Sequence, residues 1–199
     1  MTYFLIIYII AKKIIMTPKT IHVLNKIDVE KYPYIIFDCF GTLLNIQTCY
    51  PFKEVQEYLK ISKNDILKKS FNIEDIREKL NDEIFQIFQE KLQKDLETIT
   101  IFQDAEMIIN MLERKNIKYS ICSNLASVYG KSVEKFFLKE KLILSYLVGY
   151  KKPEKEIYQI CEKNSYEKKE NILFVGDNLY NDYLEPIQYG FQALYLKRI

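Results

Sequence analysis

Three apolar runs in this 199-residue chain each end in a side chain that could do chemistry: Asp38, Ser123 and Asp177. Lys152 precedes a proline, and Asp182 follows five residues after Asp177. An aspartate at the end of a buried strand can act as a nucleophile or ligate a metal. A lysine among acids stays charged. Together these groups could transfer a phosphoryl group by positioning and electrostatics.

The runs at 34–37, 119–122 and 172–175 show no polar alternation, which is typical of strands buried on both faces. Helical patterns separate them, so we expect right-handed crossovers and a mostly parallel sheet. The carboxyl ends of such strands meet at one edge, where open α/β folds hold ligands. The sequence predicts an α/β fold, a Rossmann-like three-layer sandwich with a small helical domain added.

Three carboxylates at that edge, those of Asp38, Asp177 and Asp182, would repel one another. A divalent cation removes this penalty, and Mg²⁺ favours oxygen ligands. We expect Asp38 and Asp177 to bind the metal. Asp182 is expected behind them or joined to the metal through water.

The phosphoryl oxygens need donors. Ser123 with its neighbouring backbone amides is one candidate, and Thr42 and Asn124 are others. Each group also has an ordinary structural interpretation: Ser123 with Asn124 as a helix cap, Lys152 as a surface lysine with Lys151 as its rival, and the last two acids as a turn with an N-cap.

The order of nucleophile, hydroxyl, lysine and acid pair resembles the haloacid dehalogenase (HAD) superfamily, from about Lys31 to the C-terminus. The resemblance implies that Asp38 attacks phosphorus and forms an aspartyl-phosphate, which water then hydrolyses. Magnesium and Lys152 would neutralise the phosphoryl oxygens. The resemblance also implies that the backbone carbonyl of Phe40 is a metal ligand.

The segment 46–101 has apolar residues at helical spacing and charges on the other face. We interpret it as a helical insert, and the resemblance implies a cap that closes over the active site and selects the substrate. The α/β core would then comprise residues 31–45 and 102–199. Residues 1–30 are expected to be an N-terminal extension and lead-in, with 17–33 loosely packed.

Phe40 departs from the phosphatase pattern, which usually has a second aspartate two residues after the nucleophile. Losing a general acid and base typically costs about 10²–10⁴-fold in rate. An acyl phosphate, which has a good leaving group, would suffer less.

An aromatic residue here resembles the 2-haloacid dehalogenase branch instead. That branch generally lacks the metal carboxylates and uses an arginine soon after the first motif, whereas the next arginine after Asp38 is Arg77. A third alternative is a non-catalytic domain that binds metal or phosphate.

Composition limits the partners. A net charge of +2 gives no basis for nucleic-acid binding, and the four cysteines form no CxxC pair, so a zinc site is not expected. They fit reduced thiols of a cytoplasmic protein, and a small phosphorylated molecule is the expected partner. The apolar run 3–10 is too short to span a bilayer, and Met16 is an alternative start. The sequence leaves the oligomeric state open.

Overall fold

The computed structural model describes residues 17–71 and 73–198. The apolar run 3–10 and the alternative start Met16 lie outside the described residues.

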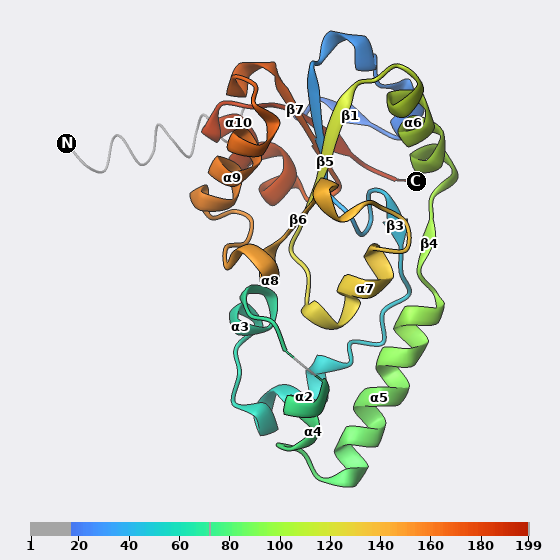
Figure 1. The fold of residues 1–199 in the computed structure, drawn as a ribbon, viewed down its shortest axis with the longest axis vertical. Helices are drawn as coiled ribbons and strands as arrows, with labels where there is room; N and C mark the ends of the chain where they lie inside the picture. The colour runs from blue at the N-terminus through green and yellow to red at the C-terminus, as the bar shows by residue number, and fades with distance from the viewer. Residues whose placement is uncertain (1–16, 72, 199) are drawn as a thin grey trace, which may run out of the picture.

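A six-stranded sheet of order β1-β8-β7-β2-β5-β6 forms the centre of the molecule, and every neighbouring pair in it is parallel (Figure 1). Its strands are β1 (Thr20–Ile21), β2 (Tyr34–Phe37), β5 (Lys118–Ser123), β6 (Leu142–Leu144), β7 (Ile172–Gly176) and β8 (Gln192–Leu196). A small antiparallel ribbon pairs β3 (Leu44–Asn45) with β4 (Thr100–Ile101). The predicted parallel α/β sheet is confirmed.

Helices cover both faces of the sheet. On one face lies α6 (Gln103–Arg114), and on the other lie α9 (Lys155–Ser165) and α10 (Glu185–Tyr189) (Figure 1). Shorter helical turns connect them: η1 (Leu24–Lys26), η2 (Val29–Lys31), η3 (Ser127–Tyr129), α7 (Gly130–Val133), η4 (Lys139–Lys141), α8 (Ser145–Val148), η5 (Lys169–Asn171) and the π-helix η6 (Leu179–Leu184).

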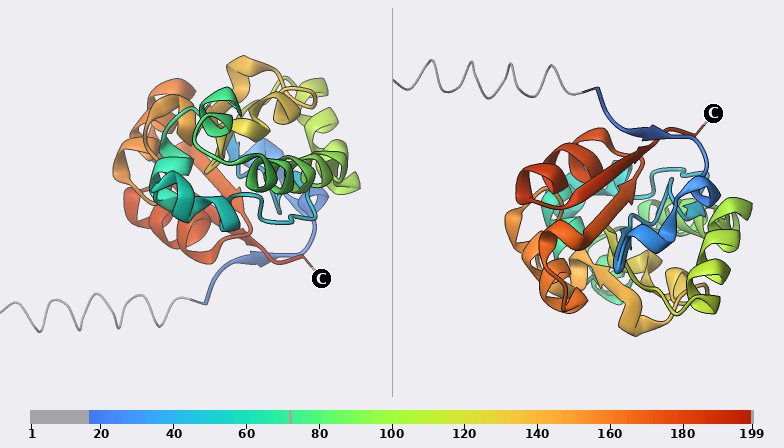
Figure 2. Two further views of the ribbon diagram at one scale, coloured as in Figure 1. Left: turned by 90° about the horizontal axis from the view of Figure 1, so that it is seen from below. Right: turned by 90° about the horizontal axis from the view of Figure 1, so that it is seen from above.

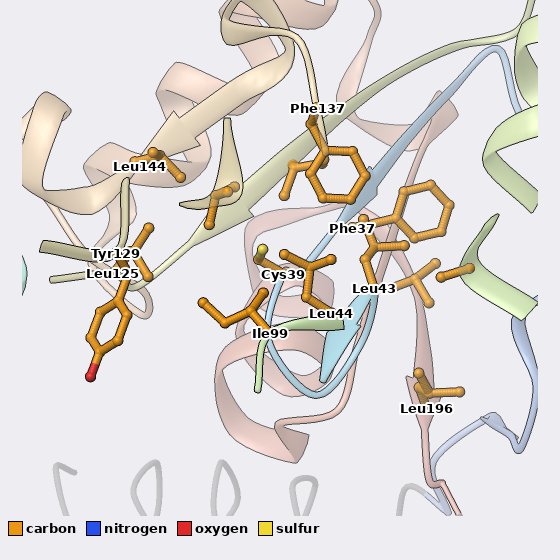
Figure 3. Close-up of a cluster of buried hydrophobic side chains, with 14 of the residues drawn as sticks. Phe37, Cys39, Leu43, Leu44, Ile99, Leu125, Tyr129, Phe137, Leu144 and Leu196 are labelled. Carbon is orange, nitrogen blue, oxygen red and sulfur yellow. The ribbon is translucent and has the colours of Figure 1, made fainter. Parts of the chain in front are cut away.

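Strand β2 shows why the apolar runs have no polar alternation. Ile35 and Phe37 pack toward α6, while Tyr34 and Ile36 pack toward α9. Figure 3 shows Phe37 within the first of these clusters. All four side chains are buried. Fully burying a side chain of this size contributes about 1.5–3 kcal/mol, so the central strand is held from both faces.

Between β3 and β4 the chain is helical, as the periodicity of 46–101 predicts. The helices are α2 (Phe52–Leu59), α3 (Lys63–Lys68), α4 (Ile73–Arg77) and α5 (Asp82–Glu97). They lie together below the sheet in Figure 1 and in front of it in the left view of Figure 2. No helix in the described part of the chain is both long and apolar enough to cross a bilayer.

The expectation of a loosely packed lead-in over residues 17–33 is wrong. Leu24, Ile27 and Val29 are buried, and β1 pairs with β8. The α/β core therefore begins before residue 31. Two-residue strands and single-turn helices are too short to leave a periodic pattern, so only their tertiary contacts reveal them.

Candidate active site

Strand register brings the predicted residues to one edge of the sheet. Phe37 lies opposite Ile121 of β5 and Val175 of β7, so Asp38 is level with the ends of both neighbours. The N–H of Asp38 donates to the carbonyl of Val175 at 2.8 Å. A cavity of about 180 Å³ opens at this edge, lined by Asp38, Phe40, Ser123, Asn124, Lys152, Asp177, Asn178, Asn181 and Asp182.

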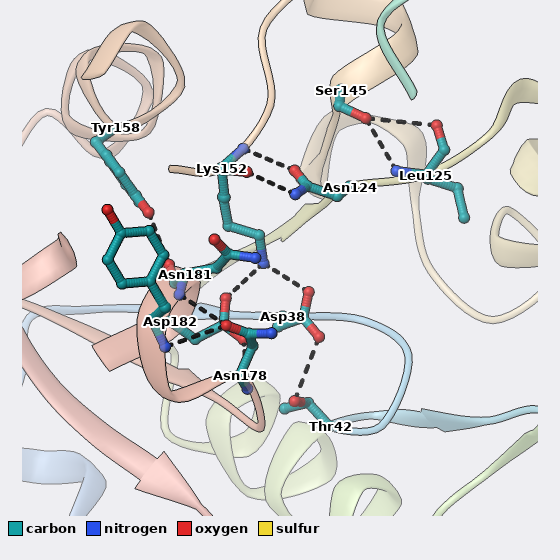
Figure 4. A network of polar contacts seen from close by, with 11 residues as sticks. Asp38, Thr42, Asn124, Leu125, Ser145, Lys152, Tyr158, Asn178, Asn181 and Asp182 are labelled. Carbon is teal, nitrogen blue, oxygen red and sulfur yellow. Dashed lines mark hydrogen bonds and ion pairs between the residues drawn. The ribbon is translucent and has the colours of Figure 1, made fainter. Parts of the chain in front are cut away.

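Lys152 is the buried cation of the site (Figure 4). Its Nζ donates to Asp38 Oδ1 at 2.6 Å and to Asp182 Oδ1 at 2.7 Å. Burial alone would lower the pKa of Lys152, but the carboxylates of Asp182 and Asp38 raise it above the ordinary value. The lysine therefore stays charged. Lys151 makes neither of these contacts, so the structure favours Lys152 over its rival.

Asp38, Asp177 and Asp182 each present a carboxylate oxygen, and these three oxygens lie within 4.8 Å of one another. Loss of water and the charge of Asp38 raise the pKa of Asp177 to about 6. Burial raises the pKa of Asp182 to about 7, although Lys152 opposes this shift. One lysine thus leaves negative charge uncompensated, and a hard divalent cation fits this set of oxygen ligands.

Two glycines allow the acids to come this close. A Cβ on Gly41 would lie 2.1 Å from Asp177 Oδ2, and Gly41 has a positive φ of 82° that favours glycine. A Cβ on Gly176 would lie 2.4 Å from Cγ of Asp182. Any larger residue at either position would displace a carboxylate.

Arg198, near the C-terminus, holds the turn that follows Asp38. Its Nε donates to the carbonyl of Gly41 at 3.1 Å and its Nη2 to the carbonyl of Thr42. Its Nη1 binds Asp104 at 3.0 Å, and its guanidinium lies 3.7 Å from the ring centre of Phe102. Sequence reasoning missed Arg198 because nothing in the local pattern distinguishes it.

The carbonyl of Phe40 has a distinctive place in this turn. The carbonyl of Cys39 accepts hydrogen bonds from the chain ahead of it, including the N–H of Leu44 at 2.9 Å. Arg198 binds the next two carbonyls after Phe40. Among the described residues, none donates a hydrogen bond to the Phe40 carbonyl. This atom is therefore available as a ligand, as the metal prediction requires.

Of two predicted phosphate donors, Thr42 lies outside the cavity wall, and Asn124 lines the cavity with its side-chain amide already paired. Thr42 is fully buried, and its hydroxyl lies 3.5 Å from Asp38 Oδ2, so it supports Asp38 from behind and is absent from the cavity wall. Asn124 pairs reciprocally with the backbone of Lys152, donating to its carbonyl at 2.8 Å and accepting from its N–H at 2.7 Å. The amide group thus fixes the lysine loop. Ser123 lines the cavity as expected.

The acid pair belongs to both a turn and the site. The side-chain oxygen of Asn178 accepts hydrogen bonds from the N–H groups of Tyr180 and Asn181, which caps η6. The N–H of Asn178 donates to Asp182 Oδ2 at 3.0 Å. The segment does form a capped turn, but the cap is Asn178 and neither aspartate, and this turn directs Asp182 toward Lys152.

A second buried carboxylate lies at the boundary with the helices of 46–101. Asp95 of α5 is fully buried and accepts from the hydroxyls of Tyr129 at 2.6 Å and Thr48 at 2.9 Å. It also accepts from the N–H of Cys49. Asp95 therefore ties α5 to the start of the insert and to η3. Sequence reasoning missed it, although its spacing from Phe88 and Leu92 places a carboxylate on the buried face of α5 and could have revealed it.

Comparison with known proteins agrees with the fold. The family model "Haloacid dehalogenase-like hydrolase" matches residues 34–192. No curated protein gives a significant sequence match.

Solved structures are similar at low identity. A HAD family enzyme of Bacteroides thetaiotaomicron is 16% identical with a TM-score of 0.62, covering 82% of this chain and 93% of that one. The same enzyme was solved in complex with magnesium and inorganic phosphate. A predicted HAD-like family hydrolase of Porphyromonas gingivalis is 21% identical, with a TM-score of 0.63 and coverage of 84% and 92%. A predicted phosphoglycolate phosphatase of Haemophilus somnus is 15% identical, with a TM-score of 0.56 and coverage of 83% and 85%.

Proposed function

This chain belongs to the haloacid dehalogenase-like hydrolase family, and from that premise we propose that it is a magnesium-dependent phosphatase with Asp38 as its nucleophile. The substrate is a small phosphorylated molecule. The observation that carries the proposal is the cluster of Asp38, Asp177 and Asp182 beside the buried Lys152.

The charges support this reading. A phosphoryl group is a dianion and would be repelled by three carboxylates with one lysine. Burial is the main cause of the raised pKa values of Asp177 and Asp182, and the charge of Asp38 raises both further. When bound, magnesium would neutralise these carboxylates and the phosphoryl oxygens, and Asp38, Asp177 and the Phe40 carbonyl would hold it, with Asp182 behind them. The magnesium and phosphate complex of the Bacteroides enzyme supports the same choice of metal.

The chain's own residues would carry the reaction in two steps. An oxygen of Asp38 attacks phosphorus, and the bond to the leaving oxygen breaks with its electron pair leaving on that oxygen. Lys152 and Ser123 hold the phosphoryl oxygens during this transfer. Water then forms a bond to phosphorus, the bond to Asp38 breaks, and the water proton ends on the released phosphate or in solution.

The helices of 46–101 would act as a cap. They lie beyond the carboxyl ends of the strands, on the open side of the site (Figures 1 and 2). Side chains from this segment and from the core line a shared cavity beside Phe40. We therefore assign substrate selection to residues 46–101 and chemistry to the α/β core.

Dehalogenation fits less well, despite the aromatic residue at position 40. A haloacid carboxylate would need a free arginine near Asp38. Arg198 is near the turn, but its three nitrogens bind the carbonyls of Gly41 and Thr42 and the carboxylate of Asp104. The metal-type acid cluster would also have no role in that reaction.

Hydrolysis of acetyl phosphate and para-nitrophenyl phosphate tests the proposal. We expect the wild-type protein to hydrolyse these substrates with magnesium and not with chelator. Asp38→Asn should hydrolyse neither substrate under either condition. The matched control is Asp75→Asn, the same change on an exposed face of α4. This variant should keep wild-type turnover.

Undiminished turnover in Asp38→Asn would remove Asp38 as the nucleophile. Turnover that survives the chelator would remove the metal. Halide release from 2-chloropropionate without phosphate release would favour the dehalogenase alternative.

A further inference from the structure

A second cavity of about 470 Å³ adjoins the site, and it shares Phe40 and Asn124 with the smaller one. Its walls come from five parts of the chain: the turn after β2, the segment after β3, helices α2 and α3, and the residues that follow β5. A group bonded to a phosphate held near Asp38 would extend directly into this space. The cavity is therefore placed to hold the part of the substrate that is not transferred.

Apolar and aromatic side chains make up most of this wall. Phe40 meets Tyr129 edge to face, with ring centres 6.2 Å apart at 72°. The polar end of Tyr129 is already bound to Asp95, so the residue offers its ring to the cavity. Other apolar side chains complete the wall: Ile46, Phe52, Ile66, Leu67, Leu125 and Ala126. Such a surface favours an apolar or aromatic body over a small hydroxylated one.

The rim of the cavity is positively charged. Lys53 of α2 and Lys63 of α3 both line it and are exposed to solvent. Among the described residues that line the cavity, none is acidic. A negative group at the far end of the substrate would be attracted to this rim.

Phe40 also limits which leaving groups the site can accept. Phe40 cannot give a proton to the leaving oxygen, so that oxygen departs with its negative charge. Weakly basic oxygens, those of phenols and carboxylic acids, leave readily in this state. Oxygens of aliphatic alcohols do not, and would need the missing acid.

Resting on the proposed phosphatase function, we propose that the natural substrate is the phosphate of a weakly basic oxygen, aryl or acyl, whose apolar body fills this cavity and carries an anionic group to Lys53 and Lys63. Asp38 takes the phosphoryl group, and the phenolate or carboxylate leaves with the electron pair of the broken bond. The released phenolate takes its proton from solvent afterwards.

Two substrates of nearly equal size test the leaving oxygen. Phenyl phosphate and benzyl phosphate differ by one methylene but leave as a phenolate and an alkoxide. We expect kcat/KM to be at least about 100-fold higher for phenyl phosphate, in line with the absence of a general acid. Equal rates would overturn this part of the proposal. Benzoyl phosphate against phenyl phosphate then shows whether the acyl or the aryl compound is preferred.

A charged probe tests the rim. We expect Lys53→Ala/Lys63→Ala to raise KM for 4-carboxyphenyl phosphate about fivefold and to leave KM for phenyl phosphate unchanged, as expected for loss of partly exposed ion pairs. Lys118→Ala, on the opposite end of β5, is the matched control and should change neither value. Equal effects on the two substrates, or no effect, would overturn the role of the lysines.

A cavity-filling variant tests the body of the substrate. Leu67→Trp should lower kcat/KM for phenyl phosphate about tenfold, because misfits of this size in apolar pockets are worth factors of that order. Acetyl phosphate is too small to reach the cavity, so its turnover should not change. Loss of both activities would show damage to the site and overturn the assignment of the cavity.

These outcomes are distinct from failure of the proposed function. If acetyl phosphate is hydrolysed with magnesium and Asp38 but the aryl substrates show no preference, only the substrate class is wrong. If no phosphate compound is hydrolysed, the phosphatase function itself is wrong, and the substrate class falls with it.

Discussion

Arg198→Ala should both destabilise the protein and weaken magnesium binding. The guanidinium donates to two backbone carbonyls in the turn after Asp38 and to Asp104 of α6. Removing it leaves Asp104 with one donor among the described residues, the N–H of Leu24 at 2.7 Å. The side chains of the pair keep 22% and 13% exposure, so the interaction is largely shielded from water.

The magnitude follows from these contacts. Breaking a buried ion pair by removing one partner costs about 3–5 kcal/mol, and partial exposure places this pair at the lower end. For a chain of this size 1 kcal/mol moves the melting temperature by about 2–4 °C, so we expect a fall of about 6–12 °C. Arg198→Lys keeps the charge but loses the planar set of donors, and should show about half of that fall.

Thermal unfolding followed by circular dichroism measures the first effect, and calorimetric titration of magnesium measures the second. The metal effect is expected because the turn that Arg198 holds also carries the free carbonyl of Phe40. Lys197→Ala is the control, since its exposed side chain is adjacent and only its backbone carbonyl binds His22. A shift of about 2 °C corresponds to about 1 kcal/mol or less for a chain of this size. If the melting temperature of Arg198→Ala lies within about 2 °C of wild type, the stability argument is refuted. An unchanged magnesium affinity would refute the link to the site.

Four further predictions follow from single contacts. Phe40→Asp should speed hydrolysis of benzyl phosphate by up to about 10²–10⁴-fold, because the aspartate can give a proton to the leaving alkoxide. Hydrolysis of phenyl phosphate should gain much less, because phenolate leaves without a proton. Equal gains on the two substrates would show that proton donation is not the cause. Asp177→Asn should weaken magnesium binding in calorimetry while the fold, followed by circular dichroism, is kept. With chelator present, the melting temperature should fall as the pH rises from 3.8 toward 7. The pKa values of Asp177 and Asp182 in the folded state, about 6 and about 7, lie above the unfolded value of 3.8, so the folded state binds more protons than the unfolded state in that range. A rising melting temperature would contradict the raised pKa values, and Asp177→Asn should make the dependence on pH weaker. Asp95→Asn should cost about 2–3 kcal/mol in urea unfolding, since three donors lose a buried carboxylate, whereas the exposed Asp75→Asn, in the first turn of α4, should cost less than about 1 kcal/mol.

The sheet could be predicted because its strands carry their own signal. β2 and β7 are almost wholly apolar, as is typical of strands buried on both faces, and β5 departs from this only at Lys118 and its two serines. β1 could not be predicted, since two residues, Thr20 and Ile21, cannot show a period. Its place beside β8 depends on a contact between opposite ends of the chain.

The site was predictable to the extent that its residues end strands. Asp38 and Asp177 directly follow β2 and β7, and Ser123 is the last residue of β5, so topology alone brings them together. Thr42 was misplaced because its position depends on how the turn closes, and the turn buries its hydroxyl against Asp38. Arg198 could not be found, because its role rests on contacts with residues more than ninety positions away.

Phe40 links the two cavities into one argument about specificity. An aspartate at this position would supply a proton, but it would also put a fourth carboxylate beside three that already repel one another. The phenyl ring instead packs on Tyr129 and continues the apolar wall of the larger cavity up to the nucleophile. Position 40 can then bind the apolar body of a substrate whose leaving oxygen needs no proton. Substrates with strongly basic leaving oxygens would need an acid at this position instead. The exchange of acid for aromatic is therefore expected to narrow the substrate range to weakly basic leaving groups on apolar bodies.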